Sequence, residues 1–217
     1  STWPPGSSPK VDSRGYVSVG PPFPGVEIKI LQEDNHPFPT EVGEIAVRSL
    51  ANTRGYFHDP TATRHLFTDD GFILTGDLGY IDAEGNLYFI SRKKNIIKRS
   101  GETISPSEIE GIVDQLDFVR YSAAVGVEQI RTEGEQVYVF AEIRDWGDIQ
   151  ETGLYERILE IVNTIHRRMG FRPGRVYLLK DHTIPMTANG KIQHGVLKTK
   201  YLEGSLRASD AILYPEY

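Results

Sequence analysis

Cysteine is absent from the 217 residues of the sequence. Disulfide bonds, thiolate metal sites and a thiol nucleophile are therefore excluded. Apolar runs are short, and none approaches the roughly 18 residues of a membrane-spanning helix. Basic residues are outnumbered, with 24 Lys and Arg against 30 Asp and Glu, which gives a formal net charge of −6. Binding to nucleic acid or to a membrane surface usually needs a basic face, so we expect neither partner.

The start of the chain lacks both an initiating methionine and a signal peptide. Residues 1–10 are polar and rich in Pro, Gly and Ser, which is typical of a linker. A chain that begins with Ser1 is expected to be a piece of a longer protein, and its expected location is the cytoplasm. Hydrophobic residues make up 39% of the sequence, which is sufficient for a globular core.

Residues 1–91 have the pattern of a β-rich barrel or sheet. Short runs of strand-forming residues are separated by Gly, Pro, Asp or Asn, and residues 82–86 predict a hairpin turn. A proline-started helical turn is expected at Pro60. The predicted strands are Tyr16–Val19, Val26–Leu31, Glu44–Arg48, Phe72–Leu74, Gly79–Ile81 and Leu87–Ile90.

The pattern changes after the basic stretch at residues 92–95, and residues 96–217 are expected to be α+β. Ser105 is the expected helix N-cap, with Pro106 at the first helical position and Glu108 completing a capping box. Apolar periodicity predicts a longer amphipathic helix up to Met169. Further predicted elements are strands at Val119–Val127, Gln136–Arg144 and Arg175–Leu179, and helices at Leu154–Met169 and Val196–Leu202. The fold class expected for the whole chain is therefore mixed.

Three motifs carry candidate chemistry. Asp77 follows Thr75-Gly76 at a predicted strand end, where its carboxylate could accept two hydrogen bonds from a ribose diol. Residues 92–99 hold five cations in eight positions, which suits phosphate groups. Lys191 leaves an Asn-Gly turn, where its ammonium could approach a developing negative charge. Taken singly, each motif also has a purely structural interpretation. Asp77 fits a solvated turn, residues 92–99 fit a charged linker, and Lys191 fits an exposed hairpin lysine.

In their order along the chain, these motifs resemble the late motifs of the adenylate-forming superfamily. That superfamily includes acyl-CoA synthetases, luciferases and peptide-synthetase adenylation domains, and the resemblance runs from about Tyr16 to Leu202. The matching segments are Gly43–Thr63 for its Gly-Glu-Ile…Gly-Tyr…Pro-x-x-Thr stretch, Thr75–Asp77 for its Thr-Gly-Asp, Arg92–Glu110 for its hinge and following loop, and Asn189–Ile192 for its Gly-Lys motif.

The resemblance implies an organisation and a two-step reaction. Residues 1–91 would end the large adenylation domain, residues 92–95 would be a hinge, and residues 96–217 would form a small mobile α+β lid domain. A carboxylic acid first attacks the α-phosphate of ATP, which gives an acyl-adenylate and pyrophosphate. A thiol then displaces AMP while the small domain rotates. The implied partners are a carboxylic acid, coenzyme A or a carrier-protein phosphopantetheine, and the rest of the large domain.

Residue roles follow from the same resemblance. Lys191 is the expected catalytic residue of the first step. Asp77, Arg92 and Lys98 are expected at the nucleotide, and Lys94 lies at the hinge. The loop expected to line the thiol tunnel consists of Ser100, Gly101, Glu102 and Thr103.

Other parts of the superfamily's site do not occur in this sequence. The phosphate loop and the Tyr-Gly-x-Thr-Glu motif, whose Glu holds Mg²⁺, would lie in a missing amino-terminal part, so no metal ligand is expected among these residues. Many relatives have Arg where His194 stands, which puts a neighbouring ion pair in doubt.

The loop at residues 100–110 resembles acyl-CoA synthetases more than peptide-synthetase adenylation domains, which favours an acid:CoA ligase whose incomplete active site leaves the chain inactive alone. One alternative is an acyl-AMP ligase or an adenylation domain that loads a carrier-protein thiol. An alternative of a different class is a stand-alone, non-catalytic binding module.

Overall fold

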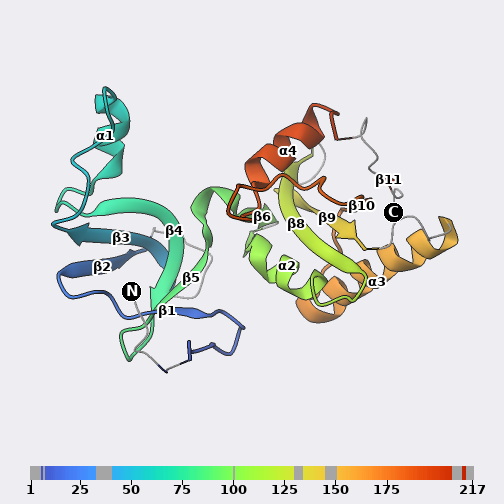
Figure 1. The fold of residues 1–217 in the computed structure, drawn as a ribbon, viewed down its shortest axis with the longest axis horizontal. Coiled ribbons are helices and arrows are strands. Elements are labelled where there is room, and N and C mark those ends of the chain that lie inside the picture. The colour runs from blue at the N-terminus through green and yellow to red at the C-terminus, as the bar shows by residue number, and fades with distance from the viewer. Residues whose placement is uncertain are drawn as a thin grey trace. The chain divides into compact units, whose positions relative to one another are not determined.

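The computed structural model describes residues 6, 8–32, 41–99, 101–129, 134–144, 151–206 and 212–213. The chain divides into two compact units, Ser1–Lys94 and Asn95–Tyr217. Figure 1 shows helices and antiparallel strands in both units, so the expected mixed fold class is confirmed.

The first unit is built on a five-stranded antiparallel sheet of order β1-β5-β4-β3-β2. Its strands are β1 (Ser18–Gly20), β2 (Val26–Leu31), β3 (Gly43–Ser49), β4 (Ile73–Ile81) and β5 (Leu87–Arg92). Helix α1 (Pro60–Leu66) lies between β3 and β4 in the chain, and it begins as expected, with Pro60 in its first turn. The Asp59 carboxylate caps this helix by accepting a hydrogen bond of 2.8 Å from the Ala62 amide.

Strand β4 corrects one prediction. The sequence predicts two strands with a Thr-Gly turn between them, whereas β4 is continuous from Ile73 to Ile81. Leu74 pairs with Ala46 and Leu78 pairs with Glu44, so the three residues 75–77 face a single position of β3. Gly76 has a φ of +70°, which lets the extra residues bulge out. Asp77 therefore lies in a mid-strand bulge and not at a strand end.

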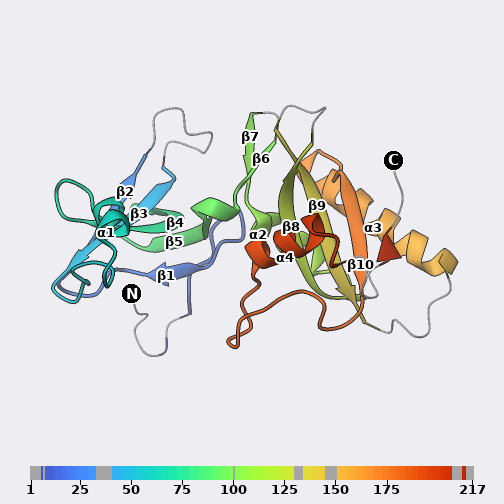
Figure 2. The ribbon, with the colours of Figure 1, turned by 90° about the horizontal axis from the view of Figure 1, so that it is seen from above.

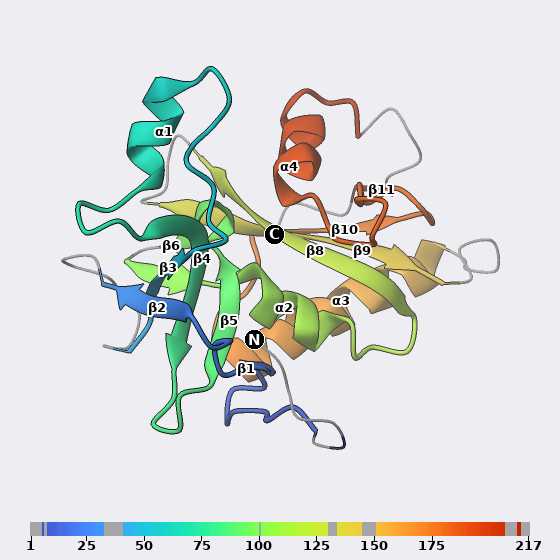
Figure 3. The same ribbon diagram turned by 60° about the vertical axis from the view of Figure 1, so that its left-hand side comes forward.

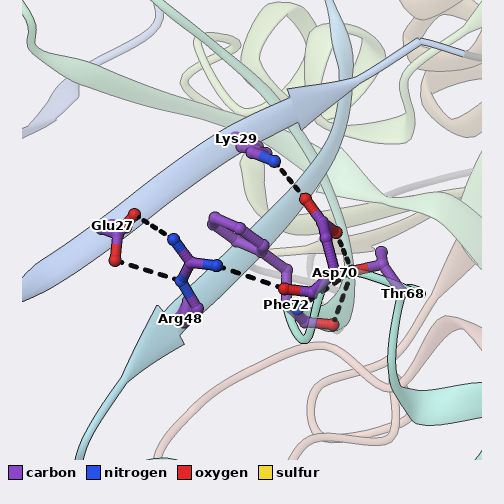
Figure 4. Close-up of polar contacts among 6 residues, drawn as sticks. All are labelled: Glu27, Lys29, Arg48, Thr68, Asp70 and Phe72. Atoms are coloured by element: carbon purple, nitrogen blue, oxygen red, sulfur yellow. Dashed lines mark hydrogen bonds and ion pairs between the residues drawn. The ribbon is translucent and has the colours of Figure 1, made fainter.

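Two basic side chains and one aromatic ring hold the turn before β4 against β2 and β3. Figure 4 shows Lys29 and Arg48 on either side of the Phe72 ring, at 4.3 and 4.4 Å from its centre. Lys29 pairs with the Asp70 carboxylate, and Arg48 donates to the Asp70 carbonyl oxygen at 3.2 Å. Glu27 accepts two hydrogen bonds from Arg48, at 3.0 and 2.6 Å. These contacts hold the strand that carries Asp77 onto its neighbours.

The second unit has a four-stranded sheet of order β11-β10-β9-β8. Its strands are β8 (Val119–Glu128), β9 (Glu135–Ile143), β10 (Arg175–Leu179) and β11 (Ile212–Leu213). Strands β9 and β10 are parallel, and helix α3 (Glu151–Met169) provides the crossover that parallel strands need.

Alternate residues of β9 face two separate cores. Val137, Val139 and Ala141 pack with helix α2 (Pro106–Val113) and with α3. Tyr138 and Phe140 pack on the opposite face with helix α4 (His194–Leu202). Figures 2 and 3 show α4 on one side of this sheet and α2 and α3 on the other. A sheet covered by helices on both faces fixes the elements that carry the candidate residues.

The start of the second unit departs from two predictions. Strands β6 (Ile97–Arg99) and β7 (Glu102–Ile104) pair as a small antiparallel hairpin, where the sequence predicts only a tight loop. Ser105 is the N-cap of α2, but its side chain makes no capping hydrogen bond. Its hydroxyl lies 2.7 Å from that of Ser107 instead, so its part of the expected capping box is wrong.

Asp70 gives the first unit a dependence on pH. The Lys29 ammonium and the Thr68 hydroxyl lower the pKa of the Asp70 carboxyl from 3.8 to about 2. A lowered folded-state pKa contributes stability above the unfolded value, and that contribution is lost as the pH falls from about 4 towards 2. Asp70→Asn is therefore expected to lower the melting temperature at neutral pH, with a gap that closes in acid. Thermal unfolding monitored by circular dichroism across this range measures the gap.

Asp69→Asn is the matched control, because it removes an exposed carboxylate from the same turn and leaves the Lys29–Asp70 pair in place. A gap for Asp70→Asn that stayed constant with pH would contradict this account.

Candidate functional site

The bulge in β4 brings two predicted nucleotide residues together. Asp77 and Arg92 are cross-strand partners on β4 and β5, and Arg92 Nε lies 2.9 Å from Asp77 Oδ1. Arg92 Nη1 also donates to the Thr75 carbonyl oxygen at 3.1 Å. The guanidinium therefore spans the bulge and fixes the carboxylate beside it.

Thr75 closes the bulge from the other side. Its hydroxyl donates to the Ile45 carbonyl oxygen at 2.7 Å and accepts a hydrogen bond from the Asp77 amide at 3.1 Å. The hydroxyl thus satisfies backbone groups that the bulge removes from the strand ladder. The three residues of the Thr-Gly-Asp motif therefore contribute differently to the geometry. Thr75 closes the loop, Gly76 allows the turn and Asp77 presents the carboxylate.

Glu44 is a residue that sequence reasoning treated as structural only. Its carboxylate is almost buried on β3, with 9% of the residue exposed. Oε1 accepts a hydrogen bond from the Gly76 amide at 3.1 Å, and Oε2 accepts one from Lys93 Nζ at 2.8 Å. Glu44 therefore ties the bulge to the residue that directly precedes Lys94. The Gly-Glu-Ile resemblance was the one available signal, and it did not reveal these partners.

Lys94 is exposed and is the last residue of the first unit. It lies in a short 3-10 turn, η1 (Lys93–Asn95), that follows β5 directly. Its role as a hinge stays a prediction.

Lys191 lies at the end of a closed turn in the second unit. The Thr187 amide donates to the Lys191 carbonyl oxygen at 2.8 Å, and the Gly190 amide donates to that of Thr187 at 2.9 Å. The Thr187 hydroxyl accepts a further hydrogen bond from the Lys191 amide at 3.1 Å. Gly190 has a φ of +74°, so the predicted Asn-Gly turn is confirmed. The Lys191 side chain is exposed at the tip of this hairpin, residues 185–193.

Three carboxylates hold the segment that carries this hairpin. Glu142 is 1% exposed and accepts a hydrogen bond from the Ile184 amide at 2.7 Å, just before the hairpin. Just after it, Glu110 Oε1 lies 2.6 Å from His194 Nε2. On α4, Lys198 Nζ lies 3.0 Å from Glu135 Oε1. The segments on both sides of the Lys191 hairpin are therefore held to the rest of the second unit.

The remaining predicted residues lie in the β6–β7 hairpin. The Lys98 amide donates to Glu135 Oε2 at 3.0 Å, and the Lys98 side chain is exposed. Gly101 turns the hairpin with a φ of +81°, followed by exposed Glu102 and half-buried Thr103. Ser100, also predicted for this loop, lies outside the described residues.

Among the residues that the structure describes, no group of three or more His, Asp or Glu side chains has a geometry that could hold a metal ion. No described helix is long and apolar enough to cross a membrane.

Known proteins resemble this chain in both sequence and structure. No family model matches the chain. Phenylacetyl-CoA ligase epaB of Aspergillus niger is 36% identical over 88% of this chain and 34% of its own length. The structure of ATP-bound MatB from Rhodopseudomonas palustris superposes with a TM-score of 0.72 at 29% identity, covering 85% of this chain and 35% of MatB.

A structure of McyG A-PCP complexed with phenylalanyl-adenylate gives a TM-score of 0.75 at 26% identity, over 89% of this chain and 30% of that one. The chain belongs to the adenylate-forming superfamily. It corresponds to a carboxyl-terminal portion of such enzymes and spans about a third of the length of the curated relatives it matches. Within this superfamily, relatives of the chain include both CoA ligases and peptide-synthetase adenylation domains.

Glu44→Gln tests the link between the bulge and Lys93 in this superfamily member. The amide oxygen can still accept from Gly76, but the NH₂ group would face the Lys93 ammonium, so one charge-assisted hydrogen bond is lost. We expect the free energy of unfolding to fall by about 1–2 kcal/mol, as measured by urea denaturation.

Glu41→Gln is the matched control, because Glu41 is an exposed glutamate just before β3. Equal stability changes in the two variants would show that the Glu44 contacts contribute nothing.

Proposed function

We propose that the chain is part of an AMP-forming carboxylic acid:CoA ligase. The observation that carries this proposal is the Asp77–Arg92 pair on the bulge of β4, in a chain related to CoA ligases. In this proposal residues 1–91 end the large adenylation domain, residues 92–95 are the hinge, and residues 96–217 form the mobile small domain.

In the first half-reaction, a carboxylate oxygen of the acid attacks the α-phosphorus of ATP. The bond from that phosphorus to the bridging oxygen breaks, and pyrophosphate leaves. The Asp77 carboxylate accepts hydrogen bonds from the ribose hydroxyls, with Arg92 holding it in orientation and reaching the same ribose. Lys98 adds a positive charge near the nucleotide. The Lys191 ammonium stabilises the negative charge that builds up between the carboxylate and the α-phosphate.

In the second half-reaction, the sulfur of coenzyme A attacks the carbonyl carbon of the acyl-adenylate. The bond from that carbon to the phosphate oxygen breaks, and AMP leaves. The loop at residues 100–103 lines the path of the thiol. The second unit changes its position about Lys94 between the two steps, because one face serves adenylation and another serves thioester formation.

Mg²⁺ is expected to neutralise the phosphates of ATP in such an enzyme. Among the described residues, no group of three or more His, Asp or Glu side chains could hold a metal ion. The magnesium ligand, the phosphate loop and the acid pocket are assigned to the remainder of a longer enzyme, since this chain spans only about a third of the curated relatives.

An alternative acceptor is the phosphopantetheine thiol of a carrier protein. The similarity to McyG A-PCP supports it, because that structure joins an adenylation domain to a carrier domain. Assaying the full-length enzyme with coenzyme A and with a carrier protein that bears a free phosphopantetheine thiol distinguishes the two acceptors. A stand-alone binding module is the remaining alternative, and a reading frame that opened at Ser1 would favour it.

The 217-residue chain alone is expected to show no exchange of pyrophosphate into ATP with any acid, because the phosphate loop and the acid pocket are missing. Isotope exchange with a panel of carboxylic acids measures this activity. The full-length enzyme is the positive control, and turnover by the chain alone would contradict the assignment of a partial site.

Lys191→Ala in the full-length enzyme is expected to slow acyl-adenylate formation by about 10²–10³-fold, because one transition-state charge contact is worth roughly 3–4 kcal/mol. Thioester formation from preformed acyl-adenylate is expected to change far less. Hydroxylamine trapping measures the first half-reaction, and release of AMP with coenzyme A measures the second.

Lys200→Ala is the matched control, since Lys200 is an exposed lysine on α4 of the same unit. Equal losses in both half-reactions would remove Lys191 from the assigned role.

A further inference from the structure

His194 stands three residues after Lys191, as the first residue of α4. Its side chain is only 16% exposed, and both of its ring nitrogens have a partner. Nε2 lies 2.6 Å from Glu110 Oε1 on α2, and Nδ1 lies 3.3 Å from the Asn95 side-chain nitrogen. This histidine departs from the superfamily motif, and the proposed function gives it no role.

The two contacts select one form of the imidazole. The amide nitrogen of Asn95 can only donate, so Nδ1 of His194 accepts and carries no proton. The proton of a neutral ring then lies on Nε2, which donates it to the Glu110 carboxylate. A doubly protonated ring would keep the Glu110 contact, but it would oblige the Asn95 amide to turn its oxygen towards Nδ1.

The two partners of His194 belong to different parts of the second unit. Glu110 Oε1 also accepts a hydrogen bond of 2.9 Å from the Ala124 amide, which ties α2 to β8. Asn95 is the first residue of this unit and directly follows Lys94, the predicted hinge. His194 therefore connects the end of the Lys191 hairpin both to the sheet core and to the segment where the unit begins.

The two ends of the hairpin are held in different ways. On the Ile184 side, Glu142 binds a backbone amide, which any residue with a backbone N–H at that position would supply. On the other side, the contact nearest the hairpin depends on the His194 side chain itself, and the Lys198–Glu135 pair lies one turn further along α4. Between these ends, the Gln193 amide donates to the Pro185 carbonyl oxygen at 2.8 Å, so the hairpin moves as one piece. Loss of His194 would remove the contact closest to one end of a stiff element, and its lysine tip would shift.

We infer that His194 is a positioning residue for Lys191: through Glu110 and Asn95 it sets where the lysine ammonium lies when the acyl-adenylate forms. The inference rests on the proposed function, since it assigns a supporting residue to the same reaction. His194 touches neither substrate nor reacting atoms and acts only through the backbone of the hairpin.

The decisive experiment compares His194→Ala with the unchanged full-length enzyme in the two half-reactions. A displacement of about 1 Å at a catalytic group costs up to about 10²-fold in rate, so kcat for acyl-adenylate formation is expected to fall about 10–100-fold. The KM values for ATP and acid are expected to stay within about threefold, because His194 contributes nothing to ground-state binding. Thioester formation from preformed acyl-adenylate is expected to be unchanged.

Two conservative variants separate the contacts. His194→Gln keeps a donor for Glu110 and an acceptor for Asn95, so it is expected to recover most of the lost rate. His194→Arg keeps only the Glu110 contact and is expected to recover part of it. His166→Ala, an exposed histidine on α3, is the matched control and is expected to have no effect.

A double-mutant cycle with Lys191→Ala distinguishes failure of this inference from failure of the proposed function. If His194 acts through Lys191, His194→Ala adds less than about twofold to the loss already caused by Lys191→Ala. A large loss for Lys191→Ala with none for His194→Ala, or fully additive losses, would overturn the inference and leave the proposed function standing. No loss for Lys191→Ala would overturn both.

Thermal unfolding of each variant identifies a general folding defect. If His194→Ala does not fold, His194→Arg takes its place, and the same comparison of half-reactions decides. Equal losses in both half-reactions in a folded variant would overturn the inference, because they would indicate a structural role alone.

Discussion

The Glu44 carboxylate accepts hydrogen bonds from the Gly76 amide and from the Lys93 ammonium, and much of the first unit's candidate site depends on this pair of contacts. One contact holds the bulge that turns Asp77 towards Arg92. The other holds the residue next to Lys94. A nearly buried carboxylate needs compensating donors, and here both donors belong to segments that resemble motifs of the superfamily. The same group therefore satisfies a requirement of folding and sets the geometry of the site.

The second unit uses carboxylates in a comparable way. Glu110, Glu135 and Glu142 each bind a group at or near the segment that carries Lys191, and none of them is expected to touch a substrate. A Cβ at Gly126 would lie 2.4 Å from Glu135 Oε2, so a larger residue there would push the Glu135 carboxylate away from its present position. These acidic groups hold the backbone on both sides of the Lys191 hairpin, while the Lys191 side chain is exposed.

The sequence predicted elements whose signals are local. Strand β2 matches its predicted bounds because its residues alternate, and α3 follows its apolar periodicity. The bulge was missed because Gly76 in mid-strand has the same sequence signal as a turn. The partners of Glu44 and His194 were missed for another reason: Glu110 and His194 are 84 positions apart, and no local pattern encodes such a contact. The roles of the motif residues came only from resemblance.

The long sequence separation at His194 also bears on how the protein acquires its shape. Its contacts span 84 and 99 positions, and α3 with its parallel crossover lies between the partners. Contacts of this separation carry the largest loop-closure cost and form after the local helices and hairpins. Until these contacts form, the hairpin that carries Lys191 is held chiefly at its Ile184 end, through Glu142. The position of Lys191 therefore depends on contacts that are expected to form late in the folding of this unit.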